Sequence, residues 1–124
     1  MQRSTQRAET GRQGERAAAE WLRREGYELL DTNWRSGRYE LDIVARRWDE
    51  LHFIEVKSRR AAGLTAPEEA MTLRKQQALI QAARAYLGWH PWPGEIRFDL
   101  VAVDVLPDGS MQVRFIPDAV QMHW

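Results

Sequence analysis

Apolar residues recur along the chain at two spacings, one typical of helices and one typical of strands. The helical spacing predicts a helix over about residues 12 to 25, which Gly26 would end. A second helical pattern predicts a helix over residues 73 to 87, with Thr72 as its N-cap and Gly88 as its stop. Both helices would bury one apolar stripe against the rest of the protein.

Shorter apolar segments with strand-like alternation predict five strands. Their ranges are 27 to 31, 38 to 46, 51 to 58, 96 to 106 and 111 to 116. We expect turns at "TN" (residues 32–33), "WD" (48–49) and "PDG" (107–109), and a loop that leads into a short helical turn at Pro67. The predicted order is therefore α-β-β-β-α-β-β, an α/β domain with a mixed central β-sheet flanked by helices.

Length and composition are those of one ordinary globular domain. The chain has 124 residues, of which 44% are hydrophobic and 29% charged. We expect residues 1–10 to be disordered and residues 11–124 to form a single domain. No apolar run approaches the roughly 18 residues of a membrane-spanning helix, so we expect no membrane association. The absence of cysteine excludes disulfides and thiolate metal sites and is compatible with the cytoplasm, where we expect the protein to act.

The chain has local clusters of positive charge but no net positive charge. The formal net charge is zero, which excludes a bulk electrostatic attraction to nucleic acid. The clusters are Arg35 with Arg38, Arg46 with Arg47, Arg59 with Arg60, and Lys75 in the first turn of the second helix. Arginine is preferred for bidentate phosphate contacts, but an arginine-rich composition also follows from a GC-rich genome, and both explanations stay open.

Four charged residues interrupt the apolar runs of the second and third strands. They are Glu40, Asp42, Glu55 and Lys57. A charge inside a buried strand costs several kcal/mol unless it is paired. Alternation puts Glu40 and Asp42 on one face of their strand, and Leu41 with Ile43 on the other. With a two-residue turn at residues 48–49, Asp42 would lie across from Glu55, and Glu40 across from Lys57.

Two explanations account for this cluster. Carboxylates held close together repel, which raises a pKa or requires a cation, and magnesium typically binds one or two carboxylates plus substrate phosphate. A neighbouring lysine could then orient an attacking water or stabilise charge on a phosphoryl oxygen. In the other explanation Lys57 forms an ion pair with Glu40 or Asp42 at an exposed sheet edge. Spacing alone leaves both open.

Asp42, followed after a twelve-residue gap by "EVK" at 55–57, resembles the Asp…Glu-x-Lys motif of the restriction-endonuclease-like nucleases. Further blocks extend the resemblance. The segments "GRQGERAAAEWLRREGYELLDTNWR", "ELDIVAR", "FIEVKSRR", "RKQQALIQAARAYL" and "IRFDLVAV" resemble, in order, those of the YraN-like family of uncharacterised proteins that are expected to be endonucleases. This resemblance runs from about Gly11 to Val103. Tyr39 departs from the family pattern, which usually has glycine there.

The YraN-like family is similar to archaeal Holliday-junction resolvases. The resemblance therefore implies a restriction-endonuclease-like fold and metal-dependent hydrolysis of phosphodiester bonds, with structured or branched DNA as the expected substrate. It implies that Asp42, Glu55 and the Val56 carbonyl hold Mg²⁺, for which Mn²⁺ would substitute. Lys57 would act on the attacking water, and Glu15 would support the site from the first helix.

Several expectations remain beside these. Glu40 fits the family block, and we expect it to hold Lys57 or a metal-bound water. Resolvases need two active sites to cut symmetrically, so a homodimer would suit this reaction, although the sequence does not reveal one. Two other functions stay open: a nucleic-acid-binding module with this fold but no turnover, and a partner-binding protein whose charged cluster is structural.

The histidines and one further aspartate are expected to be structural. His52, His90 and His123 are too scattered along the chain to form a trio of metal ligands. Asp99 lies in a mostly apolar strand next to Arg97, where we expect a structural salt bridge or hydrogen bond.

Overall fold

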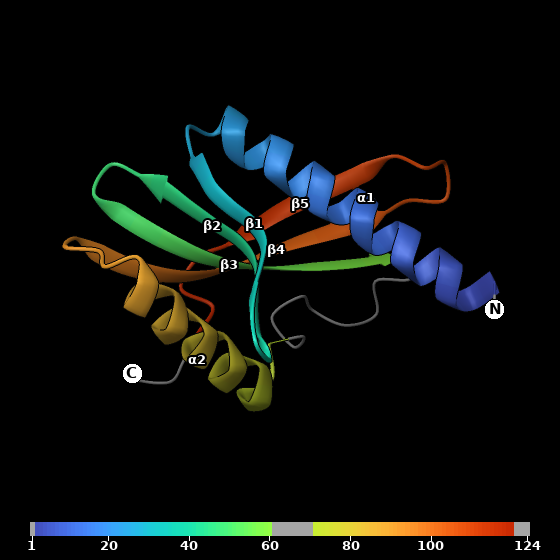
Figure 1. Cartoon of the computed structure of the whole chain (residues 1–124). Coiled ribbons are helices and arrows are strands. Elements are labelled where there is room, and N and C mark those ends of the chain that lie inside the picture. The colour runs from blue at the N-terminus through green and yellow to red at the C-terminus, as the bar shows by residue number, and fades with distance from the viewer. Residues whose placement is uncertain (1, 61–70, 121–124) are drawn as a thin grey trace.

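Two helices cover opposite faces of one five-stranded sheet in the computed structural model of the chain (Figure 1). The structure describes residues 2–60 and 71–120. Its elements are α1 (Gln2–Arg24), β1 (Glu28–Ser36), β2 (Tyr39–Arg47), β3 (Glu50–Arg60), α2 (Leu73–Trp89), β4 (Glu95–Val105) and β5 (Met111–Ile116). The predicted order α-β-β-β-α-β-β is confirmed.

The strands lie in the sheet in the order in which they occur in the chain, β1-β2-β3-β4-β5. Neighbouring strands are antiparallel except β3 and β4, which are parallel. Parallel neighbours need a crossover connection, and α2 lies in the connection between these two strands. The sheet is therefore mixed, as predicted.

Each face of the sheet carries its own apolar core. Phe53 and Leu100 face α2, where they pack with Tyr86 of that helix. On the opposite face Ile54 and Val101 pack with Leu22 of α1. Consecutive residues of one strand thus serve different cores, because side chains alternate along a strand. In the described part of the chain, no helix is both long and apolar enough to cross a membrane.

Two element boundaries near the amino end differ from the predicted ones. α1 begins at Gln2, well before residue 12, in a segment expected to be disordered whose residues show no apolar periodicity. The turn predicted at residues 32–33 is wrong, because β1 continues through them to Ser36. Asn33 takes a positive φ of 52°, which asparagine tolerates better than most residues, so the strand changes direction there without ending.

The start of α2 was predicted correctly, but its end was not. The Thr72 side chain accepts a hydrogen bond from the backbone N–H of Lys75 at 3.2 Å, which confirms the N-cap. Gly88 does not stop the helix. The helix continues to Trp89, and the His90 N–H donates to the Tyr86 carbonyl at 2.8 Å. The helical turn expected at Pro67 lies outside the described residues.

Candidate active site

The hairpin of β2 and β3 has the register that a two-residue turn at Trp48 and Asp49 requires. Its pairs run from Arg47 opposite Glu50 to Ile43 opposite Ile54. Trp48 takes a positive φ of 57°, which tight hairpin turns of two residues need. The ladder ends at its last pair, and Asp42 and Glu55 are the next residues beyond it on the two strands.

The Asp42 side chain accepts a hydrogen bond from a backbone N–H of β3 that lies beyond the end of this ladder. The Val56 N–H donates to Asp42 Oδ2 at 2.8 Å. Strict alternation predicted Leu41 on the face of Ile43, and this is wrong. Leu41 packs in the α2-side core and Ile43 in the α1-side core. The alternation therefore breaks at Asp42, opposite the stretch of β1 where Asn33 has its positive φ.

Asp42 and Glu55 carry raised pKa values. Burial raises the pKa of Asp42 to about 6; the Val56 N–H lowers it, while the charges of Glu15 and Glu40 raise it. Burial also raises the pKa of Glu55 to about 7, and the charge of Asp42 raises it further. Because the repulsion between two negative charges is mutual, Asp42 and Glu55 titrate as a pair.

Two lysines lie close enough for their charges to lower the pKa of one or both of these carboxyls, although both pKa values stay raised. The charge of Lys75 lowers the pKa of both carboxyls, and it lowers that of Glu55 more than Lys57 does. Lys57 is exposed and Lys75 half-buried. Glu40 forms an ion pair with Arg35 at 3.5 Å rather than with Lys57. Among the described residues, neither Asp42 nor Glu55 takes part in an ion pair, which weighs against the purely structural explanation of the cluster.

α1 lies directly against β3 at Gly14, and this contact places Glu15 beside the pair. A Cβ on Gly14 would lie 1.6 Å from Ser58 Oγ and 2.6 Å from Ser58 Cβ, so only glycine fits. Glu15, the next residue, is half-buried and near enough for its charge to raise the pKa of Asp42. The role of Gly14 was not predicted. Its signal in the sequence was a glycine within a helical pattern, which often marks a close packing contact.

The carboxylate pair suits a hard divalent cation. No three histidine, cysteine or acidic side chains of residues 2–60 and 71–120 gather as a metal-binding group. Magnesium needs no such group, because it keeps several waters and is held by one or two carboxylates plus substrate phosphate. Asp42 and Glu55 supply two carboxylates whose repulsion a cation would relieve. The residues present therefore fit the expected Mg²⁺ or Mn²⁺, with the Val56 carbonyl as a further oxygen.

The basic residues expected to meet nucleic acid lie in three places. Arg35 lies near the end of β1, and Arg38 lies in the turn between β1 and β2, over the ring of Tyr39 at 5.5 Å. Lys75 is in the first turn of α2. Arg59 and Arg60 end β3, and Arg59 Nε donates to Asp104 Oδ1 at 2.9 Å.

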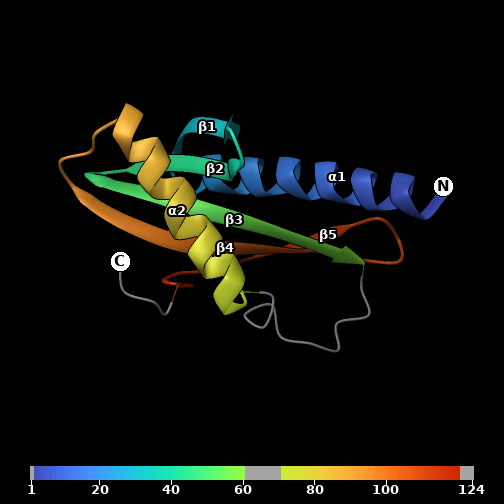
Figure 2. The same ribbon diagram turned by 60° about the horizontal axis from the view of Figure 1, so that its bottom comes forward.

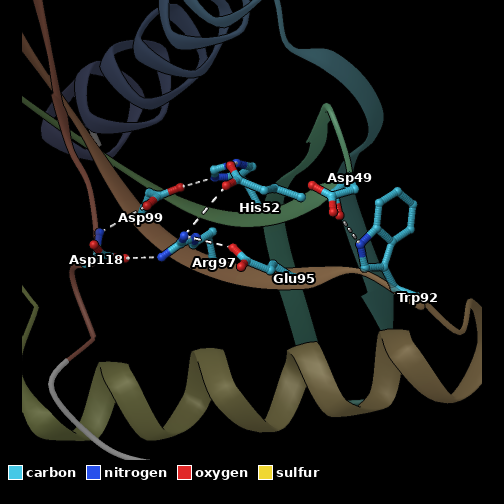
Figure 3. Close-up of polar contacts among 8 residues, drawn as sticks. Asp49, His52, Trp92, Glu95, Arg97, Asp99 and Asp118 are labelled. Atoms are coloured by element: carbon cyan, nitrogen blue, oxygen red, sulfur yellow. Dashed lines mark hydrogen bonds and ion pairs between the residues drawn. The ribbon is translucent and has the colours of Figure 1, made fainter.

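A second polar cluster, which we term the His52–Asp99 network, joins β3, β4 and the segment after β5 (Figure 3). His52 Nδ1 lies 2.5 Å from Asp99 Oδ2, and Nε2 lies 3.1 Å from Glu50 Oε1. The other oxygen of Asp99 accepts the backbone N–H of Asp118 at 3.1 Å. The structural hydrogen bond expected for Asp99 is confirmed, with His52 as its partner rather than Arg97.

Arg97 extends this network toward solvent. Its guanidinium lies 2.8 Å from a carboxylate oxygen of Glu95, 3.6 Å from Glu50 and 3.7 Å from Asp118 (Figure 3). Nearby, Trp92 Nε1 donates to the Asp49 carbonyl at 3.0 Å, which fixes the hairpin turn to the segment that precedes β4. Every acidic side chain of the network has a positively charged or N–H partner.

The chain belongs to the uncharacterised protein family UPF0102, whose profile matches residues 14–103. A relative in Nitratidesulfovibrio vulgaris is 47% identical over 95 residues, which cover 76% of this chain and 71% of that protein. One in Porphyromonas gingivalis is 44% identical over 100 residues (81% and 74%), and one in Bacteroides thetaiotaomicron is 38% identical over 111 residues (90% and 91%). The expected membership of the YraN-like family is confirmed, and the matched region contains Glu15, Asp42, Glu55 and Lys57.

Proposed function

We propose that the protein is a metal-dependent nuclease that hydrolyses phosphodiester bonds in nucleic acid, with structured or branched DNA as its substrate. One observation carries this proposal. Asp42 and Glu55 are two partly buried carboxylates whose pKa values are raised chiefly by burial. The charge of Asp42 raises the pKa of Glu55 further, and neither carboxylate has an ion-pair partner among the described residues. A fold gains nothing from burying such a pair unless a ligand completes it.

The resemblance to the restriction-endonuclease-like nucleases gives these residues their roles. Asp42, Glu55 and the Val56 carbonyl would hold Mg²⁺ or Mn²⁺, which supplies positive charge at the scissile phosphate. The Val56 N–H already holds Asp42 in place. Lys57 Nζ would donate a hydrogen bond to the attacking water or to a phosphoryl oxygen.

Three further residues would act around this centre. Lys75 is placed to attract a phosphate, since its charge already reaches both carboxyls. Glu15 would support the site from α1. Glu40 would act at longer range, through its charge on Asp42 and its ion pair with Arg35, because the structure does not pair it with Lys57.

The reaction itself is a hydrolysis. The oxygen of a water attacks phosphorus, the ester P–O bond opposite breaks, and the leaving oxygen takes up a proton. One product ends in a phosphate and the other in a hydroxyl group. Because little covalent chemistry falls to the protein, positioning and charge stabilisation would account for most of the rate enhancement.

A cleavage assay on duplex, single-stranded, flap and four-way-junction DNA, with magnesium or manganese, tests the proposal. We expect the wild type to cut at least one substrate and Lys57→Ala to lose cleavage. Metal binding should persist in Lys57→Ala, because lysine does not ligate the metal. Its affinity for DNA should fall only modestly, since one phosphate contact among several is lost.

Two outcomes would contradict the proposal. Wild-type cleavage no greater than that of Asp42→Asn and Glu55→Gln, on every substrate and with either metal, would leave a nucleic-acid-binding module without turnover. Equal cleavage by the wild type and Lys57→Ala would mean that the activity is a contaminant or that it resides elsewhere in the protein.

A further inference from the structure

Cationic side chains continue beyond the carboxylate pair on the α2 side of the sheet. Lys57 and Arg59 follow Glu55 at every second residue of β3, so they share its face. Arg114 of β5 lies in the same row as Lys57, because both pair with Ala102 of β4. In Figure 2 the carboxyl end of β3 extends past the amino end of α2.

Asp104 of β4 ties the two arginines together. Its Oδ1 accepts a hydrogen bond from Arg59 Nε and its Oδ2 one from Arg114 Nη2, both at 2.9 Å. The Asp104 side chain is 14% exposed, whereas that of Arg114 is 47% exposed. A nearly buried carboxylate thus fixes the direction of two guanidinium groups, of which the outer one reaches solvent.

The charge and geometry of this group suit phosphate. Lys57, Arg59 and Arg114 bring three positive charges to this part of the sheet, and Asp104 orients two of them. Guanidinium groups held in a fixed orientation bind phosphate with little further loss of side-chain entropy. Two strand spacings separate Lys57 from Arg114, which is roughly 10 Å. That span corresponds to about three base-pair rises along the axis of a DNA duplex.

We infer that Lys57, Arg59 and Arg114 form a track for the phosphodiester backbone of nucleic acid, and that Asp104 is the positioning residue that orients its arginines. The inference rests on the proposed function, since it places the track beside the proposed catalytic carboxylates. Substrate would run from the carboxylate pair across β4 to β5, so that contacts away from the scissile phosphate hold it in place. Neither Asp104 nor Arg114 belongs to the predicted site.

Salt-dependent binding of a short labelled DNA duplex, measured by fluorescence anisotropy in chelator, tests the track. Between roughly 50 and 200 mM salt, Arg114→Gln should reduce the slope of log affinity against log salt by about one, because one phosphate contact is lost. Arg114→Lys should restore the slope. Arg46→Gln is the matched control: Arg46 is also a strand arginine bonded to a carboxylate, Glu28 at 3.4 Å, but it lies at the hairpin end of β2. Its slope should equal that of the wild type.

Asp104→Asn separates orientation from net charge. The substitution makes the surface more positive, so charge alone would tighten binding. If Asp104 orients the arginines, affinity should instead fall severalfold, and KM for cleavage should rise more than kcat falls. Tighter binding by Asp104→Asn would overturn the positioning role.

The remaining outcomes separate the track from the proposed nuclease. If the wild type binds and cuts DNA while Arg114→Gln and Arg46→Gln have the same DNA affinity and the same salt dependence of binding, the track is wrong. The proposed nuclease function is then unaffected. If the wild type neither binds nor cuts any substrate, both fail. A change in sedimentation of Arg114→Gln, with unchanged DNA binding, would assign this face to a second copy of the chain and overturn the track.

Discussion

Acidic side chains are buried in two regions of the same sheet, and the two regions treat them in opposite ways. In the His52–Asp99 network, Asp99 is buried but both of its oxygens have partners, His52 and the Asp118 N–H. In the carboxylate pair, Asp42 accepts one backbone N–H, and its nearest acidic neighbours repel it. A buried acid with partners contributes to the fold, whereas a buried acid left without them marks a place for a ligand.

β3 contributes to both regions, which makes the comparison a close one. Glu50 and His52 lie near its beginning, and Glu55 and Lys57 lie further along the same strand. The two regions therefore share a strand but lie on opposite faces of the sheet, with His52 and Asp99 on the α1 side and Glu55 on the α2 side. Substitutions that remove one charge from each region should have different consequences for stability.

The largest effect is expected from Asp99→Ala. Removing this carboxylate leaves His52 and the Asp118 N–H without their acceptor, which should cost about 3 kcal/mol or more of unfolding free energy. Asp42→Asn is the matched control, and in chelator it should leave the unfolding free energy unchanged or raised, because it relieves repulsion. Urea denaturation measures both. If Asp42→Asn loses as much unfolding free energy as Asp99→Ala, the carboxylate pair has a structural role and the comparison is wrong.

A smaller effect is expected where α1 meets β3. Gly14→Ala places a methyl group against Ser58 and should cost about 1 to 3 kcal/mol through overpacking. It should also weaken cleavage, because Glu15 would move away from Asp42. Gly11→Ala is the control on the same helix: a Cβ there meets nothing within 4 Å, so alanine should stabilise the helix by about 0.5 to 1 kcal/mol. Thermal unfolding of both variants compares them, and equal shifts would contradict the close contact.

A third effect is expected in the pH dependence of stability without metal. Burial raises the pKa of Asp42 from 3.8 to about 6 and that of Glu55 from 4.5 to about 7. Between about pH 4 and 7 the folded state therefore binds more protons than the unfolded state, so stability falls as pH rises through this window. As the pH rises through this window, the unfolding free energy of Asp42→Asn should increase relative to that of the wild type by on the order of 2 kcal/mol. A constant difference between the two proteins from pH 4 to 7 would contradict the raised pKa values.

Local sequence patterns were enough to predict the elements and the polar side of the hairpin. The two-residue turn at residues 48–49 sets the register, and the register brings Asp42 and Glu55 to the end of the ladder. Thr72 capped α2 as its residue type predicts. These features depend on neighbours in the chain, so the chain alone reveals them.

What the sequence did not reveal depends on contacts between distant segments. Gly14 matters because Ser58 lies against it, and Asp104 matters because parallel pairing of β3 with β4 brings Arg59 to it. The break in alternation at Asp42 likewise depends on β1, where Asn33 bends the strand without ending it. A glycine or an asparagine in the sequence does not show which segment will pack against it.

Calorimetric titration with manganese tests the central claim most directly, namely that Asp42 and Glu55 are a ligand site rather than part of the fold. The wild type should bind the metal, and Asp42→Asn and Glu55→Gln should each weaken binding by at least about tenfold, since each removes one of two carboxylates. The Glu40→Gln variant, which loses a nearby charge but no proposed ligand, should bind nearly as well as the wild type. Equal manganese binding by the wild type, Asp42→Asn and Glu55→Gln would contradict the account.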